Sequence, residues 1–438
     1  MFRTIMPFIF QYIKLSKPTS WASRTDLVTW QDHQVQSFLQ KVLPQSPFYR
    51  KYYEHLSIEE WQSFPTINKS IMMDHFDTLN TIGIKKKEAF KLALQAEQTR
   101  NFTPMIKRTT IGLSSGTSGN RGLFLVSEKE RMMWAGSILA KVLPRSIFGK
   151  HRIAFFLRAN SNLYNSVAHG RITFRFFDLL TPLIQNLKEL NHFQPTSLIA
   201  PPSMLRFIAE AQLAGSIQLQ PEKVISVAEV LDPLDERVIR RAFGTIVHQV
   251  YQCTEGFIAT TCAHGTLHIN EDLLVVQKNF LDKRLRKFTP IITDFSRYTQ
   301  PIIRYDLNDI LTERADPCPC GSLHLAIEQI EGRQDDLLYF KGLDTDTPIP
   351  VFPDFIRRAL ITADEQITAY QVIQHRLGHI EIHIQSSNPD PVKLQQKIQI
   401  NIDALCQSIK VESPIIAWEA YQHPPSIHKL RRIKRMYA

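Results

Sequence analysis

The chain has 438 residues, 43% of them hydrophobic and 21% charged, which allows two or three domains with a sizeable core. This composition excludes disordered, collagen-like and coiled-coil proteins. Lys and Arg exceed Asp and Glu by 52 to 42, a mild excess that fits a site for phosphorylated ligands or a solvated basic face. No RNA-binding signature or helix-turn-helix spacing stands out, so we expect no nucleic-acid partner. Residues 6–13 are too short an apolar run to span a bilayer, so we expect a cytoplasmic protein without a membrane span.

The spacing of apolar residues predicts a helical, then an α/β, then a strand-rich stretch. The first hundred residues are amphipathic and predict helices. Apolar runs that predict strands occur at 153–157, 197–200, 223–227, 267–269, 273–276 and 302–305. Helical periods at 203–214 and 234–242 alternate with the first of these runs. We therefore expect an α/β fold, with a large domain of layered sheets and helices that includes a strand-rich subregion.

The last hundred residues predict a second, small α+β domain. Residues 369–375 and 379–385 flank Leu377-Gly378 as the two strands of a hairpin. Residues 391–409 have helical spacing, and 415–421 predict another strand. The expected boundary lies in Gly332-Arg-Gln-Asp335, which gives a large N-terminal domain over 1–334 and a small, mobile C-terminal domain over 335–438.

Four of the 16 glycines lie close together in Thr110-Ile-Gly-Leu-Ser-Ser-Gly-Thr-Ser-Gly-Asn-Arg-Gly122. Clustered glycines free backbone N–H groups to face an anion, while hydroxyls and an arginine add donors and charge. Strand-like residues at 109–113 and 123–126 predict a hairpin tip rather than a flexible linker. The segment lacks the Lys-Ser/Thr of a Walker loop. The expected phosphate-binding residues are Ser114, Ser115, Gly116, Thr117, Ser118, Gly119 and Arg121.

This segment resembles the phosphate-binding loop of the adenylate-forming superfamily, which includes the acyl-CoA synthetases. The resemblance is closest to the branch of phenylacetate–coenzyme A ligase and its relatives that adenylylate a deazaflavin coenzyme. It extends over essentially the whole chain, because further motifs occur in the family's order. It implies ATP and Mg²⁺ as bound cofactors and coenzyme A as co-substrate.

Two of the further motifs imply contacts with adenine, phosphate and magnesium. Tyr251-Gln-Cys-Thr-Glu255 is similar to Tyr-Gly-x-Thr-Glu, whose ring lies by the adenine, whose Thr contacts phosphate and whose Glu holds Mg²⁺. The resemblance therefore implies these roles for Tyr251, Thr254 and Glu255, and a carboxylate supplies the hard oxygen ligands that Mg²⁺ prefers. Ala228-Glu229 resembles the turn that flanks the adenine, although valines replace the usual Gly and Pro around it.

Three motifs nearer the C-terminus imply the ribose contact, the hinge and a mobile lysine. Arg304-Tyr-Asp-Leu-Asn-Asp309 looks like Arg-Tyr-x-x-Gly-Asp, whose last Asp accepts both ribose hydroxyls. Gly332-Arg-Gln-Asp-Asp336 matches Gly-Arg-x-Asp-Asp, which implies that Arg333 contacts the nucleotide and that Asp335 is the hinge. Ser426-Ile-His-Lys429-Leu-Arg-Arg432 resembles Gly-Lys-x-x-Arg, which implies that Lys429 is catalytic. Lys434 is the alternative.

The five cysteines, with no export signal, indicate a thiolate or metal role rather than a disulfide framework. Cys318-Pro-Cys320-Gly matches a Cys-x-Cys-Gly of the phenylacetate ligase branch, and Cys262 and His268 match a Cys…Gly-x-His there. Some members hold Zn²⁺ with such residues, and three thiolates with one imidazole suit a closed tetrahedral site. His264 or His324 is an alternative fourth ligand, and reduced cysteines without metal are the alternative to zinc.

We expect an enzyme that activates a carboxylic acid with ATP as an acyl-adenylate and then transfers the acyl group to coenzyme A or a carrier-protein thiol. Transfer of AMP to a hydroxyl of a coenzyme or sugar is one alternative, and a non-catalytic nucleotide-binding protein is another. Pocket candidates for the acid follow the strand at 153–157 and are Arg158, Asn160, Asn162 and Tyr164. The sequence indicates neither the acid nor the oligomeric state.

Overall fold

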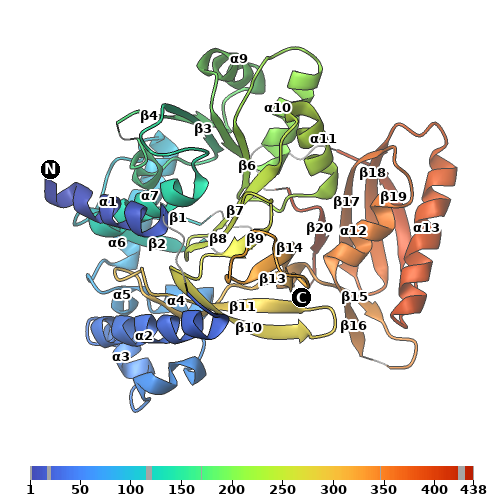
Figure 1. The fold of residues 1–438 in the computed structure, drawn as a ribbon. Helices are drawn as coiled ribbons and strands as arrows, with labels where there is room; N and C mark the ends of the chain where they lie inside the picture. Colours follow the sequence, from blue (N-terminus) through green and yellow to red (C-terminus); the bar gives the residue numbers. More distant parts are fainter. Residues whose placement is uncertain are drawn as a thin grey trace.

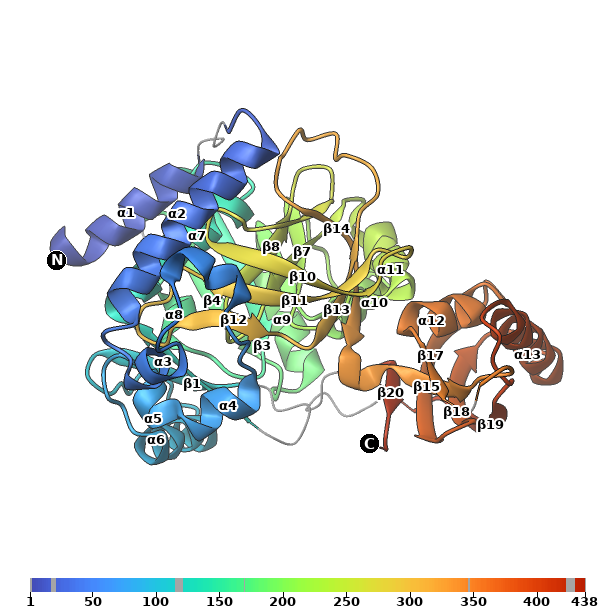
Figure 2. The same cartoon turned by 90° about the horizontal axis from the view of Figure 1, so that it is seen from below.

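The computed structural model describes residues 2–16, 21–114, 121–168, 170–345, 347–422 and 430–437. Figure 1 shows a large part, coloured blue to yellow-orange, and a small part in orange and red that lies to one side of it. The same separation is visible from below in Figure 2. The predicted α/β class, with a small α+β part at the C-terminal end, is confirmed.

One sheet of twelve described strands runs through the large part. Its parallel half has the order β7-β6-β5-β3-β4, and its antiparallel half has the order β10-β11-β13-β14-β9-β8, with β12 on β11. The two halves join where β7 pairs antiparallel with β8. The strands are β3 (His151–Leu157), β4 (Ile172–Asp178), β5 (Ser197–Ala200), β6 (Lys223–Val227), β7 (Val247–Gln252), β8 (Phe257–Thr261), β9 (Leu267–Ile269), β10 (Leu274–Asp282), β11 (Lys287–Asp294), β12 (Ile302–Asp306), β13 (Asp309–Glu313) and β14 (Ala326–Arg333).

The predicted hairpin around the glycine-rich segment is present as β1 (Thr109–Leu113) and β2 (Leu123–Ser127). The two strands pair antiparallel, with Leu113 opposite Leu123. Helices cover the sheets on several sides (Figure 1). The helices of the large part are α1 (Phe2–Ser16), α2 (Arg24–Val42), α3 (Pro47–Tyr52), α4 (Lys69–Asp74), α5 (Phe76–Leu79), α6 (Lys86–Thr99), α7 (Glu128–Val142), α8 (Asn162–Asn165), α9 (Leu183–Phe193), α10 (Pro202–Leu213) and α11 (Pro233–Phe243), with a 3₁₀ turn at Ile58–Ser63.

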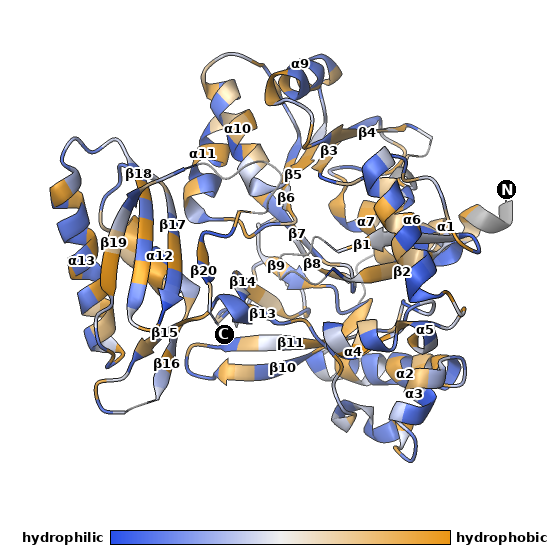
Figure 3. Cartoon of the chain, turned by 180° about the vertical axis from the view of Figure 1, so that it is seen from behind, coloured by the Kyte–Doolittle hydropathy of each residue, from blue (hydrophilic) through white to orange (hydrophobic). Residues whose placement is uncertain are grey.

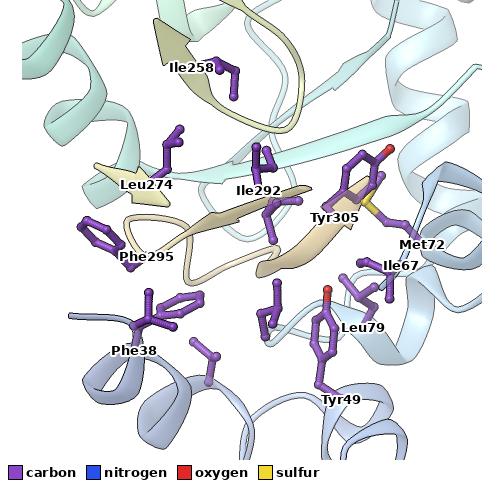
Figure 4. Close-up of a cluster of buried hydrophobic side chains, with 14 of the residues drawn as sticks. Phe38, Tyr49, Ile67, Met72, Leu79, Ile258, Leu274, Ile292, Phe295 and Tyr305 are labelled. Carbon is purple, nitrogen blue, oxygen red and sulfur yellow. The ribbon is translucent and has the colours of Figure 1, made fainter. Parts of the chain in front are cut away.

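The N-terminal helices and the antiparallel half of the sheet share one hydrophobic core. Phe38 and Tyr49 come from the helices, and Ile292 and Tyr305 come from the strands that face them (Figure 4). All four side chains are buried. Exposing these apolar side chains to water would cost free energy. The N-terminal helices and the antiparallel strands therefore fold as one unit.

The small part is a four-stranded sheet with helices packed on it. Its strands β17 (Ile367–Arg376) and β18 (His379–Ser386) form the predicted hairpin, flanked by β19 (Ile415–Ala420) and β20 (Ile433–Arg435). The helices α12 (Pro353–Ile361) and α13 (Pro391–Ser408) pack on this sheet and bury its hydrophobic side chains. The hydrophobic residues of its strands appear as orange segments in Figure 3. A short 3₁₀ turn (Gln334–Asp336) and the pair β15 (Leu338–Lys341) and β16 (Pro348–Val351) connect it to the large part.

Helix α1 packs very closely against α7. A methyl group at Gly136 of α7 would lie 2.5 Å from the carbonyl oxygen of Phe8 and 3.1 Å from the backbone nitrogen of Tyr12. Within the described residues, no helix is both long and apolar enough to cross a membrane.

We expect Gly136→Ala to lower the free energy of unfolding by about 1–3 kcal/mol, because the added methyl forces α1 away from α7. The same exchange in an unconstrained helix interior is stabilising by about 1 kcal/mol. Urea unfolding measures the change, and a more stable variant would contradict the close approach.

Candidate functional site

A cleft of about 1710 Å³ lies where the parallel strands of the main sheet end. Residues just beyond β3, β5, β6 and β7 line it, and the carboxyl edge of such a sheet is where open α/β folds bind ligands. The residues predicted from sequence that line the cleft are Ser114, Arg121, Arg158, Tyr164, Ala228, Glu229, Tyr251, Thr254, Glu255, Asp309, Arg333 and Asp335. Ser115, Gly116, Thr117, Ser118, Gly119 and Lys429 lie outside the described residues.

Glu255 is a buried carboxylate held from both sides. The Thr254 hydroxyl donates to its Oε2 at 2.8 Å, and the Tyr305 hydroxyl donates to its Oε1 at 2.9 Å. Burial, reinforced by the negative Glu255, raises the pKa of Tyr305, so its phenol stays a proton donor. A carboxylate has about four lone-pair sites, so two remain for another ligand. Tyr305 belongs to the Arg-Tyr motif but was given no role by sequence reasoning.

Asp309 begins β13 and lies opposite Tyr251 of β7, whose hydroxyl donates a hydrogen bond to it. Burial raises the pKa of Tyr251 well above its usual value, and the Asp309 charge adds to the shift. The preceding residue, Asn308, has φ +59° and its N–H donates to the Asp306 carboxylate at 3.0 Å. Asn tolerates this left-handed backbone better than other residues with a side chain, so it can stand at a turn position where Gly is otherwise common.

Two cations, one of them on α4, lie beside the β1–β2 hairpin. Arg121 forms an ion pair with Glu97 of α6, with one N–O distance of 2.8 Å, and its Nε donates to the Ser114 carbonyl at 3.3 Å. Lys69, the first residue of α4, lies close to Gly122. A methyl group added at Gly122 would lie 3.1 Å from the Cε atom of Lys69. Burial lowers the pKa of Lys69, and the Glu255 charge opposes that shift. Sequence reasoning missed Lys69 because it lies in the N-terminal helical stretch, outside every motif.

The turn after β6 connects the cleft to the C-terminal tail. Ala228 has φ +68°, a conformation that costs free energy for a residue with a Cβ and is often found at functional sites. Glu229 accepts a hydrogen bond from the backbone N–H of Ser203 at 3.3 Å and another from that of Leu430 at 3.4 Å. The tail therefore crosses the mouth of the cleft one residue after Lys429.

The two arginines that follow hold the tail against both parts of the molecule. Arg431 pairs with Asp336, which lies next to the predicted hinge Asp335. Arg432 pairs with Asp235 of α11, at 2.6 Å from its Oδ2. Leu430, Arg431 and Arg432 line the cleft, whereas Lys434 lies in β20, opposite Ile373 of β17.

The inner end of the cleft is an apolar chamber. Its wall includes Trp134 of α7, Phe155 of β3 and Tyr164 of α8, whose rings contact one another with centroids 4.8–5.9 Å apart. The Trp134 indole N–H donates to the Gln252 side chain at 3.2 Å. The predicted Arg158 and Tyr164 line the cleft. Asn160 and Asn162 make structural contacts instead: Asn160 accepts from the backbone N–H of Ser161 at 2.8 Å, and Asn162 donates to the carbonyl of the distant Thr103 at 2.9 Å.

The four predicted zinc ligands come together at β9, which contains His268. The ligand atoms of Cys262, His268, Cys318 and Cys320 all lie within 4.8 Å of one another. His268 faces the group with Nε2, 3.4 Å from the Cys320 sulfur, while its Nδ1 lies 3.2 Å from the His324 carbonyl oxygen. Three sulfurs and one nitrogen at this spacing fit a tetrahedral metal site, with the backbone carbonyl orienting the imidazole. The alternative ligands His264 and His324 are outside this group.

Comparisons with known proteins agree with the fold. No family model matches the chain. A phenylacetate–coenzyme A ligase of Thermus thermophilus is 26% identical over 102 residues, which is 23% of this chain and 22% of that protein. The chain thus matches about a fifth of the length of this curated relative.

Solved structures of two enzymes share the fold of this chain over 93% and 74% of its length. A 2-hydroxyisobutyryl-CoA ligase in the postadenylation state, in complex with 2-HIB-AMP, has a TM-score of 0.68 at 15% identity and covers 93% of this chain and 88% of its own. An amide bond synthetase of Marinactinospora thermotolerans has a TM-score of 0.55 at 12% identity over 74% of this chain and 68% of its own. The chain has the fold of the adenylate-forming enzymes, and the resemblance predicted from its motifs is confirmed.

Asp294 is a second buried carboxyl group in the cleft wall. Its Oδ1 accepts hydrogen bonds from the backbone N–H and hydroxyl of Ser296 at 2.8 and 2.6 Å. Burial raises the pKa of Asp294 to about 6, against the opposing charge of Arg297. The folded protein therefore binds this proton more tightly than the unfolded chain, so the free energy of unfolding falls as the pH rises from about 4 to about 6.

We expect Asp294→Asn to remove this pH dependence, since an amide keeps the acceptor oxygen but does not ionise. Above pH 6 the variant should be more stable than the wild type by up to about 3 kcal/mol, and near pH 4 the two should converge. Urea unfolding at pH 4 to 8 measures the difference, with exposed Asp316→Asn as control. A constant difference across this range would show that Asp294 is ionised throughout.

Proposed function

We propose that the chain is an ATP-dependent ligase that activates a carboxylic acid as an acyl-adenylate and then transfers the acyl group to the thiol of coenzyme A. The observation that carries the proposal is that Glu255, Asp309 and Arg333 share one cleft with an apolar chamber. A protein with a similar fold, the 2-hydroxyisobutyryl-CoA ligase, is in complex with 2-HIB-AMP. An anthranilate CoA ligase with a TM-score of 0.52 is in complex with anthranoyl-AMP.

The residues act by positioning and by charge rather than as nucleophiles. Asp309 accepts the ribose hydroxyls, Arg333 contacts the nucleotide, and Arg121 and Lys69 neutralise phosphate charge. Glu255 would hold Mg²⁺, which draws electron density from the phosphate oxygens when bound. The acid's carboxylate oxygen attacks the α-phosphorus, the bond to the pyrophosphate oxygen breaks, and pyrophosphate leaves. The thiol then takes the acyl group from AMP.

The chamber indicates which acids fit. Its rings are apolar, and burial raises the pKa of Tyr164 to about 12, so the phenol brings no charge. An acid with an apolar body therefore fits better than a hydroxylated or keto acid, because buried polar groups of such an acid would need partners.

The arrangement of the two parts suits the first half-reaction. The TM-score against the 2-hydroxyisobutyryl-CoA ligase is 0.68 in the postadenylation state and 0.53 in the thioesterification state, with 93% of this chain covered in both. We place the hinge at Asp335, between domains 1–334 and 335–438. Rotation there would withdraw the tail and admit the thiol.

Isotope exchange between pyrophosphate and ATP tests the reaction. We expect exchange that requires both Mg²⁺ and a carboxylic acid, and an acid panel of aryl, short-chain and long-chain members identifies the class. AMP retained on an alcohol would support the hydroxyl-transfer alternative. Absence of exchange with every acid, in protein that binds ATP, would contradict the proposal.

Asp309→Ala should raise the KM for ATP by about 10- to 150-fold, because a charge-assisted contact of about 1.5–3 kcal/mol to the ribose is lost. Initial rates at varied ATP concentration give the value. Exposed Glu365→Ala in the small part is the matched control and should leave the KM unchanged. An unchanged KM in Asp309→Ala would remove the ribose assignment.

Lys429→Ala should slow acyl-adenylate formation by about 10²–10³-fold, because one transition-state charge contact is lost. Lys434→Ala is the control and should have little effect, since Lys434 lies in β20 and Leu430 to Arg432 line the cleft. Single-turnover assays measure both half-reactions. Thioester formation from a pre-made acyl-adenylate should stay near the wild-type rate, and a larger loss in Lys434→Ala would reverse the assignment.

We also propose that Cys262, His268, Cys318 and Cys320 hold one structural Zn²⁺, because their ligand atoms all lie within 4.8 Å of one another and three thiolates with one imidazole suit a tetrahedral site. Metal analysis should find about one zinc per chain. Cys318→Ser should lose it and unfold at lower temperature, whereas Cys406→Ser, in α13, should retain it. Freshly purified protein with negligible zinc would contradict the site.

A further inference from the structure

The outward face of α1 is an unbroken apolar stripe. Met6, Ile9, Phe10 and Ile13 are 52%, 41%, 66% and 51% exposed, and their spacing places them on one side of the helix. The solvent face of a surface helix normally carries polar or charged residues. Figures 1 and 2 show α1 at the periphery of the large part, where nothing in the described chain covers this stripe.

The helix cannot hide the stripe by rotating, because its inner face is fixed. Phe8 is buried, and the Gln11 side chain, also buried, donates to the Ser137 hydroxyl of α7 at 3.1 Å. The absence of a side chain at Gly136 brings the two backbones together. Gln11 and Ser137 also line the cleft, so α1 is part of the folded body.

A further exposed apolar side chain and two cations lie near α1. Phe148 is 82% exposed, and the neighbouring Ile147 donates its N–H to the Tyr12 hydroxyl of α1 at 3.1 Å. Lys150 and Arg171 are exposed around it, and Arg171 donates to the Phe148 carbonyl at 3.5 Å. Helix α1 itself contains no Asp or Glu. Exposed apolar side chains on a helix without acidic residues, next to two exposed cations, match the surface of an anionic lipid bilayer.

We propose that the α1 stripe, defined as Met6, Ile9, Phe10 and Ile13, together with Phe148 forms a docking surface for anionic phospholipid membranes. The apolar side chains enter the headgroup region, and Lys150 and Arg171 face the lipid phosphates. A second copy of the chain fits less well, because a two-fold contact through this face would bring like charges together. Such docking is peripheral and reversible, and it is independent of the proposed enzymatic function.

Vesicle co-sedimentation tests the surface. We expect the full-length protein to sediment with phosphatidylcholine vesicles that contain phosphatidylglycerol, and to bind pure phosphatidylcholine more weakly. Phe10→Ser combined with Ile13→Ser should reduce the partition coefficient by about tenfold or more. The matched control is Val392→Ser combined with Ile400→Ser on α13, where the side chains are 61% and 65% exposed. This pair should bind like the wild type.

Equal melting temperatures of the two double variants show that neither result comes from unfolding. Pyrophosphate exchange should be the same in both variants, so a failure of docking is distinguishable from a failure of the proposed reaction. The proposal is overturned when the wild type does not sediment with anionic vesicles or when the α13 pair loses binding equally. A dimer in gel filtration that Phe10→Ser with Ile13→Ser dissociates would assign the stripe to a second copy instead.

Discussion

A buried cluster of ions at the start of α11 joins the two parts of the molecule. Asp232 caps the helix by accepting from the Leu234 N–H at 2.9 Å, and it also accepts from the Tyr370 hydroxyl of the small part at 2.7 Å. Asp235 lies one turn further on and binds Arg432 of the tail and Arg206 of α10. Removing one partner of such a buried pair costs about 3–5 kcal/mol, because the other charge stays buried and uncompensated.

This ion cluster holds the C-terminal tail in place at the cleft. Arg432 lies three residues after Lys429, so its pairing with Asp235 keeps the tail at the cleft mouth, where Leu430 reaches Glu229. Burial opposes the charge of Arg432, but the charges of Asp235 and Asp232 outweigh it and raise the pKa of Arg432, so its guanidinium keeps its proton. The rotation that we propose at Asp335 would have to break these contacts. Under that proposal, the cluster favours the arrangement that suits adenylation, and the free energy needed to break it separates the two half-reactions.

Local sequence signals predicted much of this molecule. The strands at 197–200 and 223–227 were predicted because a strand that is buried on both faces has a short, continuous apolar run. The hairpin around Leu377-Gly378 was predicted because its turn is determined by a few neighbouring residues. The predicted nucleotide-binding residues that the structure describes line one cleft, and of these Ala228, Glu229 and Thr254 follow strands of the parallel half of the sheet. Lys69, the Asp232–Arg432 contact and the single sheet joining both strand regions were not predicted, because they depend on tertiary contacts between distant segments.

The rate of acyl-adenylate formation in Asp235→Asn tests the role of the ion cluster most directly. Glu236→Gln, the next residue on the same helix, is the matched control, because Glu236 pairs only at the surface with Arg240 at 3.3 Å. The account predicts that Asp235→Asn slows single-turnover adenylation about tenfold or more, while thioester formation from a pre-made acyl-adenylate is unchanged or faster. The control should adenylate at the wild-type rate. Adenylation at the wild-type rate in folded Asp235→Asn protein would contradict the account.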